Sequence, residues 1–258
     1  MRVRLLVPIL FIASPLAAQM PWTHNLPSRG LALDILRPSF RSGTTSATGV
    51  AAYISGRFPT GGVAIRFELP LAYGSMDSTS FSLGNPYVGI ETGRETGVVF
   101  ELGARGPLAS ENELALQVGA LSDVTRLLEA FTPDVATIAG QVRWRFRDAS
   151  GFTFDAGGGP SVLFPTQGGG DPELILHHHM MAGYHGTDVW AMAGFGGWTI
   201  ITEDAGGVGE RTIDQVGGSF GLASGNVRPA FHVLVPLDND FNSFVGVVLG
   251  LGVSVTFK

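Results

Sequence analysis

The sequence predicts an all-β fold, an antiparallel up-and-down transmembrane β-barrel of about 12 strands, with one amphipathic helix in a long external loop. Three observations predict it. The chain begins with an export-type leader and contains no later apolar helix, its segments alternate between apolar and polar residues, and its connections alternate between short and long. Each element is justified in turn below.

The first 19 residues, "MRVRLLVPILFIASPLAAQ", have the form of a secretory signal peptide. Arg2 and Arg4 are followed by a short apolar run and then by small residues, and the run is too short to span a membrane as a helix. A buried N-terminal helix is the alternative. Removal of residues 1–19 takes away two arginines and no acid, so the formal charge changes from −6 to −8. This charge excludes a nucleic-acid partner.

The composition of the rest of the chain favours a closed barrel in the cell outer membrane. The mean hydropathy is +0.26, 45% of residues are hydrophobic, 15% are charged, and there is no Cys. No run of about 18 apolar residues follows the leader, which excludes a transmembrane helix. An exported chain that is apolar on average but lacks such a helix can cross a membrane as a closed barrel. We expect residues 20–29 to form a periplasmic segment and residues 30–258 the barrel.

Strict alternation is clearest in "VAIRFELPLAY", where apolar residues take every second place from Val63 to Tyr73, and Arg66 and Glu68 lie between them. Similar segments recur between turn signals along the chain. The predicted strands are 30–40, 46–58, 62–73, 81–92, 97–105, 134–147, 151–162, 173–184, 187–201, 212–223, 227–236 and 244–257. An even number of strands is the rule in bacterial single-chain barrels.

The connections alternate in length, in phase with this strand count. "PTG", "GRET", "RDAS", "YHGTD" and "SGN" are short, whereas most connections between them are longer, including the stretch from Gly106 to Pro133. Outer-membrane barrels have short periplasmic turns and longer external loops. A β-sandwich has no reason to sort its loops in this way.

In such a barrel the apolar face of each strand meets lipid and the charges point into the lumen. We therefore expect a belt of mixed charge inside the barrel. Its members are Arg57, Arg66, Glu68, Glu91, Glu101, Arg143, Arg145 and Asp155, with Arg105 at an external end. The belt has two interpretations, a set of cross-strand ion pairs that fills the barrel and a constriction that selects solutes by charge.

Residues 106–133 interrupt the β pattern. Apolar residues at Leu114, Val118, Leu121, Val124, Leu128 and Phe131 have the spacing of an amphipathic helix. Three positions are open for it: across the barrel mouth, inside the lumen, or on the outer leaflet. The first two would gate or plug a pore.

Aromatic residues are expected to form girdles at the membrane rims. Trp144 and Phe146 precede a short turn, and Trp190 and Trp198 share one face of a strand about 20 Å apart along the membrane normal. The last strand alternates up to Val253, Val255 and Phe257, which resembles the C-terminal assembly signal of outer-membrane proteins. Lys258 after Phe257 departs from that pattern.

Several enzyme-like signals are present and are given little weight. His177 and His179 share a face and could be lumen residues, but a metal site would need further ligands, so no metal and no cofactor are expected. "GGSFG" at 217–221 matches G-x-S-x-G, yet Ser219 is expected within a strand and not at a nucleophile elbow. "DND" at 238–240 lacks the spacing of a calcium loop. The outer-membrane phospholipase carries H-x-S on one strand, and no such pattern occurs here.

The segment "LPLAYGS…SLGNPYVGIETG", Leu69 to Gly93, resembles outer-membrane barrels of the phenol meta-degradation transporter family. The similarity covers about 25 residues, and Pro86 within it predicts a bulge. It implies a channel or transporter for small solutes, with aromatic or apolar ones as candidates, and it supplies no catalytic residue.

The leading hypothesis is thus an outer-membrane channel or transporter for a small-molecule solute, and the protein is not expected to be an enzyme. The alternative is a non-conducting structural or surface-interaction barrel, and an enzyme acting on lipid is a distant third. The expected partners are outer-membrane lipid, lipopolysaccharide and the barrel assembly machinery.

Overall fold

The computed structural model describes residues 29–41, 48–76, 78–92, 96–109, 113–202 and 208–257. The expected signal peptide and residues 20–28 lie outside the described residues. The strands form one 13-stranded sheet. They are β1 (Gly30–Phe40), β2 (Thr48–Thr60), β3 (Val63–Ser75), β4 (Thr79–Leu83), β5 (Tyr87–Thr92), β6 (Gly97–Arg105), β7 (Val135–Arg147), β8 (Phe152–Pro165), β9 (Glu173–His185), β10 (Val189–Ile200), β11 (Thr212–Leu222), β12 (Val227–Pro236) and β13 (Val245–Thr256).

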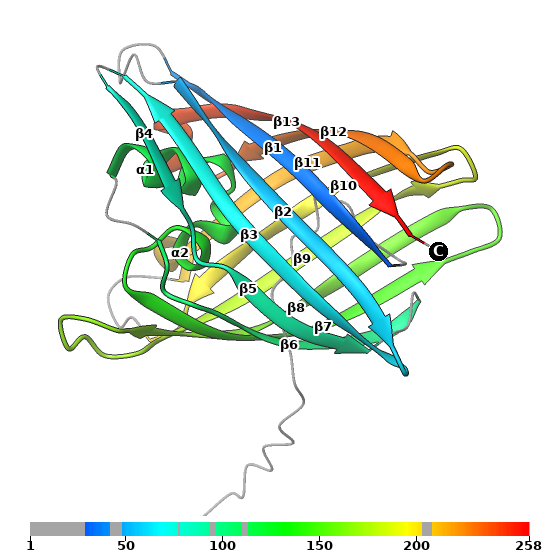
Figure 1. The fold of residues 1–258 in the computed structure, drawn as a ribbon, viewed down its shortest axis with the longest axis horizontal. Helices are drawn as coiled ribbons and strands as arrows, with labels where there is room; N and C mark the ends of the chain where they lie inside the picture. Colours follow the sequence, from blue (N-terminus) through cyan, green and yellow to red (C-terminus); the bar gives the residue numbers. More distant parts are fainter. Residues whose placement is uncertain are drawn as a thin grey trace, which may run out of the picture.

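The sheet closes on itself because β1 pairs antiparallel with both β2 and β13. All other pairings are antiparallel between chain neighbours, apart from the split pair described next. The predicted up-and-down barrel is therefore confirmed (Figure 1). The register of the closing pair places Asp34 of β1 opposite Gly252 of β13 and Tyr53 of β2.

The predicted strand 81–92 is divided in two, so the sheet makes twelve crossings with thirteen strands. β4 and β5 both pair with β3, and Gly84, Asn85 and Pro86 separate them. Proline has no N–H to give to a ladder, which explains why pairing stops here. The Gly84 N–H instead donates to Pro70 O at 2.9 Å.

The two ends of the barrel differ in their connections. At one end, which we call the turn end, short turns join β2–β3, β5–β6, β7–β8, β9–β10 and β11–β12. Gly61 and Gly62 in the first of these have φ values of 56° and 93°, as a two-residue turn with both central φ positive requires. The other end, the loop end, carries the longer connections, including those with α3 (Asn239–Phe244) and η2 (Val208–Arg211), although residues 76–78 between β3 and β4 are a short connection at the same end.

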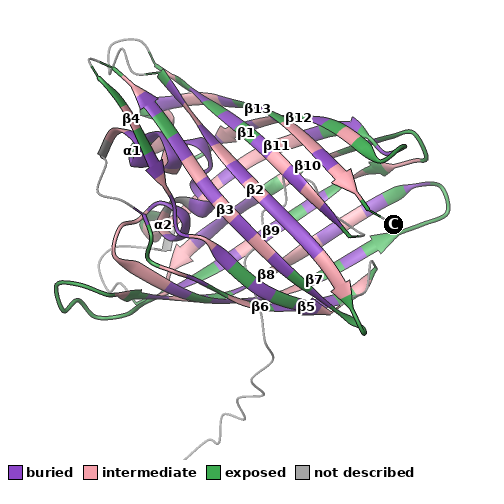
Figure 2. Cartoon of the chain, in the orientation of Figure 1, coloured by how far each residue is buried: buried purple, intermediate pink, exposed green. Residues whose placement is uncertain are grey.

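Buried and exposed residues alternate along the strands (Figure 2), and this alternation gives the barrel an apolar outside and a largely polar inside. Large apolar side chains stand exposed on the outer wall, among them Ile65, Val88, Ile90, Ile138, Phe220 and Leu251. Charged side chains are buried on the opposite face of the same strands, for example Arg66 at 1% and Glu101 at 1% exposure. This is the arrangement of a wall between lipid and a polar lumen.

The predicted helix is interrupted and lies inside the barrel. It consists of α1 (Glu113–Ser122), η1 (Val124–Arg126) and α2 (Leu127–Ala130), with a break at Asp123. Val118 touches the inner face of β2 at Gly49, and Leu114 touches that of β3 at Gly74. Residues 113–133, which we call the plug, therefore occupy the lumen at the loop end. No helix among the described residues is long and apolar enough to cross a membrane.

The expected girdle is wrong for two of its four residues. Trp144 and Phe146 are 51% and 41% exposed on the outer wall, but Trp190 and Trp198 are 9% and 3% exposed and point into the lumen. The spacing of eight residues places both tryptophans on the same face of β10, but it does not say whether that face is the inner or the outer one. The outer face carries Val189 and Phe195. The Trp198 Nε1–H donates to Val124 O of the plug at 2.8 Å. The indole N–H therefore has a hydrogen-bond acceptor inside the lumen, as it would at a membrane–water interface.

The C-terminal strand pairs along its length with β1 and β12. Leu249, Leu251 and Phe257 are exposed, and Val253 and Val255 alternate on the same side. Recognition of this strand by the assembly machinery stays a prediction.

Candidate functional site

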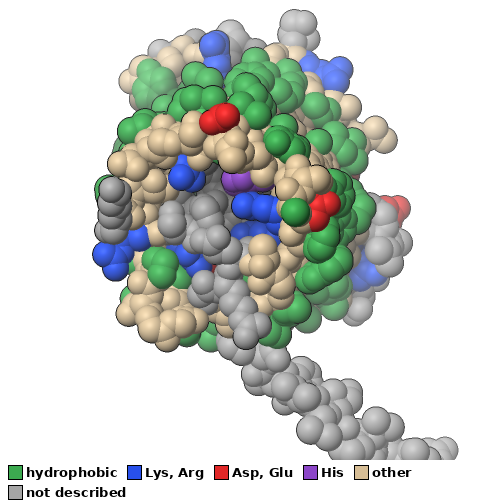
Figure 3. Space-filling model, turned by 90° about the vertical axis from the view of Figure 1, so that its right-hand side faces the viewer, with side chains coloured by type: hydrophobic (Ala, Val, Ile, Leu, Met, Phe, Trp, Pro, Cys, Tyr) green, Lys and Arg blue, Asp and Glu red, His purple; other side chains and the backbone are tan. Residues whose placement is uncertain are grey.

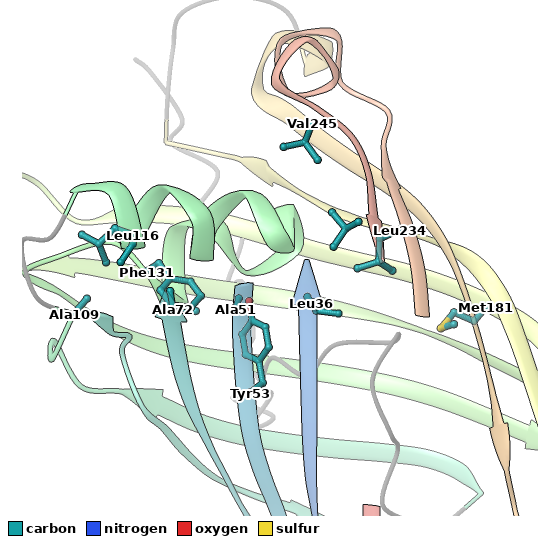
Figure 4. Close-up of a cluster of buried hydrophobic side chains, with 13 residues drawn as sticks. Leu36, Ala51, Tyr53, Ala72, Ala109, Leu116, Phe131, Met181, Leu234 and Val245 are labelled. Carbon is teal, nitrogen blue, oxygen red and sulfur yellow. The ribbon is translucent and has the colours of Figure 1, made fainter. Parts of the chain in front are cut away.

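The candidate site is the lumen, and its loop end is filled by the plug. One side of the plug packs on an apolar part of the inner wall (Figure 4). Leu116 and Phe131 of the plug belong to a buried cluster with Leu36, Ala51 and Tyr53 of β1 and β2. The rings of Tyr53 and Phe131 meet edge to face, with centroids 6.0 Å apart. This contact stabilises the inserted position through apolar burial.

The other side of the plug is attached by charged groups. Arg126 Nη1 lies 2.6 Å from Glu68 Oε2, and its guanidinium lies 4.3 Å from the centre of the Tyr53 ring. Glu129 Oε1 accepts from Ser161 and lies 3.0 Å from His177 Nε2, while its Oε2 lies 3.6 Å from Arg105 Nε. The plug thus reaches strands on opposite sides of the lumen.

Asn85, at the break between β4 and β5, fastens both ends of the plug segment. Its Oδ1 accepts from Ala109 N at 2.8 Å, before the plug begins. Its Nδ2 lies within 3.4 Å of three carbonyl oxygens, those of Glu129, Thr132 and Val135. Asn85 is fully buried. It was not among the sequence-predicted site residues, although an asparagine before a proline inside an alternating strand could have marked it.

The middle of the belt is a compact network around two carboxylates. Glu91 is bonded by Arg57, lies 2.9 Å from Arg66 Nη1 and 3.1 Å from Arg143 Nη2. Glu101 receives Arg66 at 3.1 Å, Arg143 at 3.4 Å and the Tyr87 hydroxyl at 3.0 Å. All of these side chains are at most 5% exposed. Arg105 pairs with Glu68 at 2.9 Å, nearer the plug.

Arg145 and Asp155 form a separate group toward the turn end. Arg145 Nε donates to Asp155 Oδ2 at 2.6 Å, and His179 Nε2 lies 2.9 Å from Asp155 Oδ1. His177 contacts Glu129 instead, so the two inward histidines contact different carboxylates. Among the described residues no three His, Cys, Asp or Glu side chains converge as metal ligands would.

His178, between these two histidines, faces outward. Its Nε2 lies 2.7 Å from Asp214 Oδ1 of β11, two strands away. Gly197 of β10 lies between them, and a Cβ there would come within 2.3 Å of the Asp214 carboxylate. A missing side chain on the intervening strand thus lets a polar pair form on the apolar wall.

Ser219, His232 and Asp34 form a hydrogen-bonded chain across β11, β12 and β1. Ser219 Oγ lies 2.8 Å from His232 Nδ1, and His232 Nε2 lies 3.1 Å from Asp34 Oδ1. These are the residue types of a nucleophilic triad. However, Ser219 lies inside β11 and is paired with both β10 and β12, so the neighbouring N–H groups belong to the sheet. In the described part of the chain they do not form an oxyanion hole.

We therefore expect Ser219 to be unreactive toward serine-directed acylating or phosphorylating reagents. Incubation of the refolded protein with a fluorophosphonate probe should label it no more than the Ser219→Ala variant, as read by mass spectrometry. Stoichiometric labelling that disappears in Ser219→Ala would show that the chain is a competent triad.

Two acids of the plug, which lies outside the spanning strands, have shifted pKa values. Burial raises the pKa of Asp123 to about 6, against the opposing effects of Arg126 and of hydrogen bonds from Thr125 and Gln215. The pKa of Glu129 is lowered to about 2, because its contacts with His177, Arg105 and Ser161 outweigh the large effect of burial. Ionisation of Asp123 is therefore less favourable in free energy when the plug is inserted than when the side chain is in water.

Asp123 should make plug insertion more stable as the pH falls from 7 to 5. Its pKa is higher in the inserted state than in the free state, so its contribution is complete below about 3.8 and is lost as the pH rises through about 6. Glu129 is ionised across this range and adds no pH dependence of its own. Hydrogen-exchange protection factors of residues 113–131, which are corrected for the intrinsic pH dependence of amide exchange, should be larger at pH 5 than at pH 7, and the difference should shrink in Asp123→Asn. An unchanged difference in that variant would assign the effect to another group.

Comparison with solved structures shows that the fold of this barrel is a known one. No family model matches the sequence, and no curated protein matches it. An outer-membrane channel from Pseudomonas putida F1 is similar in structure, with a TM-score of 0.62 and 9% identity over 93% of this chain and 100% of that chain. At this identity the similarity is one of fold, and the fold is that of an outer-membrane β-barrel.

Two further barrels are less similar. They are the β-domain of the Bordetella autotransporter BrkA, with a TM-score of 0.48 and 10% identity over 89% of this chain and all of that chain, and LpxR from Salmonella typhimurium, with a TM-score of 0.48 and 11% identity over 88% and 100%.

Proposed function

We propose that this protein is an outer-membrane channel for small solutes. The plug closes it at the loop end, and movement of the plug regulates its opening. The observation that carries the proposal is the position of the plug, which is inserted into a polar lumen and attached to the wall by separable polar contacts. The turn end would face the periplasm and the loop end the exterior, because outer-membrane barrels carry their short turns on the periplasmic side.

The inner wall is asymmetric, which supports passage along one side. The ion-paired belt fills the space next to β2, β3 and β5–β7. Facing it, the inward side of β11–β13 carries several small residues beside the larger His232 and Leu234, namely Gly217, Ser219, Gly221, Ala230, Gly250 and Gly252. A solute path would run past these small residues, with the belt as its charged boundary.

The plug can be removed without leaving the wall charge unbalanced. Glu68 and Arg105 each contact a plug residue, Arg126 and Glu129 respectively, and also contact each other at 2.9 Å. Loss of the plug therefore leaves the Arg105–Glu68 wall pair in place, while His177 loses its contact with Glu129. This supports a segment that can leave the lumen while the barrel stays folded.

The proposed partners follow from the location. The apolar outer wall would contact outer-membrane lipid and lipopolysaccharide, and the last strand would be recognised by the assembly machinery. The resemblance around Leu69 to Gly93 adds small aromatic or apolar molecules to the candidate solutes.

Single-channel conductance in planar bilayers tests the proposal. The refolded mature chain should give brief, small steps, and a variant with residues 113–131 replaced by a short Gly-Ser linker should give long, larger steps. β6 and β7 are adjacent, so a short linker can join them. Heat-modifiable migration on gels establishes that each variant is a folded barrel.

A specific observation also favours the alternative, a non-conducting structural barrel. The belt is buried and mutually paired, as expected of residues that fill a lumen and define its register. A folded but silent plug-deletion variant would establish that alternative and reject the channel.

A further inference from the structure

The turn end of the lumen carries a group of three arginines and two histidines, which we call the vestibule: Arg145, Arg147, His179, His185 and Arg228. Arg147 Nη2 lies 3.1 Å from His185 Nδ1. Arg145, Arg147 and Arg228 are all close enough to His185 to interact with it electrostatically. Figure 3 looks at this end of the barrel and shows Arg side chains in blue and a His side chain in purple inside its rim.

Positive charge exceeds negative charge on this part of the inner wall, although the whole chain has a formal charge of −6. The inward arginines between mid-depth and the turn end are Arg57, Arg66, Arg143, Arg145, Arg147 and Arg228, and the inward carboxylates are Asp34, Glu91, Glu101 and Asp155. Asp34 contacts His232, and Glu91 and Glu101 are shared by other arginines. Among the inward carboxylates that the structure describes, Asp155 is thus the one that contacts the vestibule.

Asp155 does not accept hydrogen bonds from all the buried donors of Arg145. The Arg145 Nε donates to Asp155, but its Nη2 is buried and has no hydrogen-bond partner among the residues that the structure describes. The second oxygen of Asp155 is taken by His179. Asp148 in the adjacent turn is held by Ser150 N, Ser150 Oγ and Phe152 N. A buried donor without a partner is costly, and a guanidinium group in this state calls for an acceptor with negative charge.

We infer that the vestibule binds the carboxylate group of a small organic anion, with Arg145 as the principal contact and Arg147 as the second. A guanidinium group bonds a carboxylate through parallel N–H donors, and such charge-assisted bonds are stronger than neutral ones. The vestibule therefore gathers anions at the turn end of the lumen. The role of the vestibule as an entry or exit site for solutes rests on the proposed channel. If the channel conducts, small organic anions are its solute class.

Ligand-observed NMR on the refolded mature chain in micelles tests the inference without any need for conduction. The probes are propionate and propionamide, which have nearly the same shape and differ in charge. Propionate should show saturable binding, propionamide should not, and Arg145→Gln should weaken propionate binding roughly tenfold or more, because one charge-assisted contact is lost.

Arg147→Gln provides a second variant at the exposed rim, where folding is not at risk, and it should weaken propionate binding by a few fold. Arg37→Gln, on the exposed outer face of β1, is the matched control and should bind as the parent chain does. Equal binding of the two probes, or unchanged binding in both vestibule variants, would overturn the inference. A silent bilayer with intact propionate binding would instead reject the channel and keep the anion site.

Discussion

Replacement of Glu91 by Gln should lower the free energy of unfolding by about 3–5 kcal/mol, the usual cost of removing one partner from a buried ion pair. Glu91 is contacted by Arg57, Arg66 and Arg143, and each of these arginines is buried. Gln keeps the shape of the side chain but removes the negative charge. Each of the three arginines would then lose one charged contact.

Urea unfolding in detergent micelles, followed by tryptophan fluorescence and heat-modifiable migration, measures this change. Glu173→Gln, at the exposed start of β9, should have an effect within about 0.5 kcal/mol and serves as the control. A second variant separates charge from packing. Adding Arg143→Met to Glu91→Gln lowers the excess of positive charge around the remaining carboxylate, Glu101, and should recover part of the lost stability. If Glu91→Gln behaves like Glu173→Gln, the belt contributes nothing to stability.

The positions of the belt residues could be inferred from the sequence because of a simple periodicity. Side chains alternate strictly in a strand, so the apolar set Val63, Ile65 and Phe67 determines the opposite direction of Arg66 and Glu68. The pairing within the belt was less predictable. Glu101 contacts Arg143, whereas Arg145, two residues further along the same strand, contacts Asp155. The choice depends on how long side chains extend across neighbouring strands.

The same reasoning did not resolve β10. Its residues alternate between Trp or Met on one face and Ala, Gly or Phe on the other, so both faces are apolar and periodicity cannot tell lipid from lumen. The direction of Trp198 depends on a carbonyl acceptor at Val124, a residue 74 positions away. Contacts of this kind belong to the tertiary structure and leave no mark on the local pattern.

The location of the plug could not be predicted for a related reason. Its apolar spacing indicates a helix with one buried side, but an apolar side can be covered by a lumen, by loops or by lipid. What decides the matter is the recess on the inner wall. At Gly49 an added Cβ would lie 2.7 Å from Val118, and at Gly74 it would lie 2.9 Å from Leu114. The glycines are visible in the sequence, but their partners are not.

Asn85→Ala should release the plug while the strands stay paired, and this is the largest functional effect we expect from one substitution. The variant loses the bonds from Ala109 N and to the carbonyls of Glu129, Thr132 and Val135. These groups would be buried without partners at about 1–3 kcal/mol each, unless the segment leaves the lumen and they are hydrated. Release of the plug avoids that cost, so the equilibrium should move toward the open state by more than about a hundredfold.

Two measurements should change together in Asn85→Ala. Hydrogen exchange in residues 113–131 should accelerate, and single-channel steps should become longer and larger. Asn226→Ala, in an exposed turn at the opposite end of the barrel, is the matched control and should resemble the parent chain. Fast exchange without conductance would mean that the plug is mobile but that the belt alone seals the lumen, which would favour the non-conducting barrel. Slow exchange would mean that the apolar contact of Phe131 with Tyr53, and not Asn85, holds the plug in place.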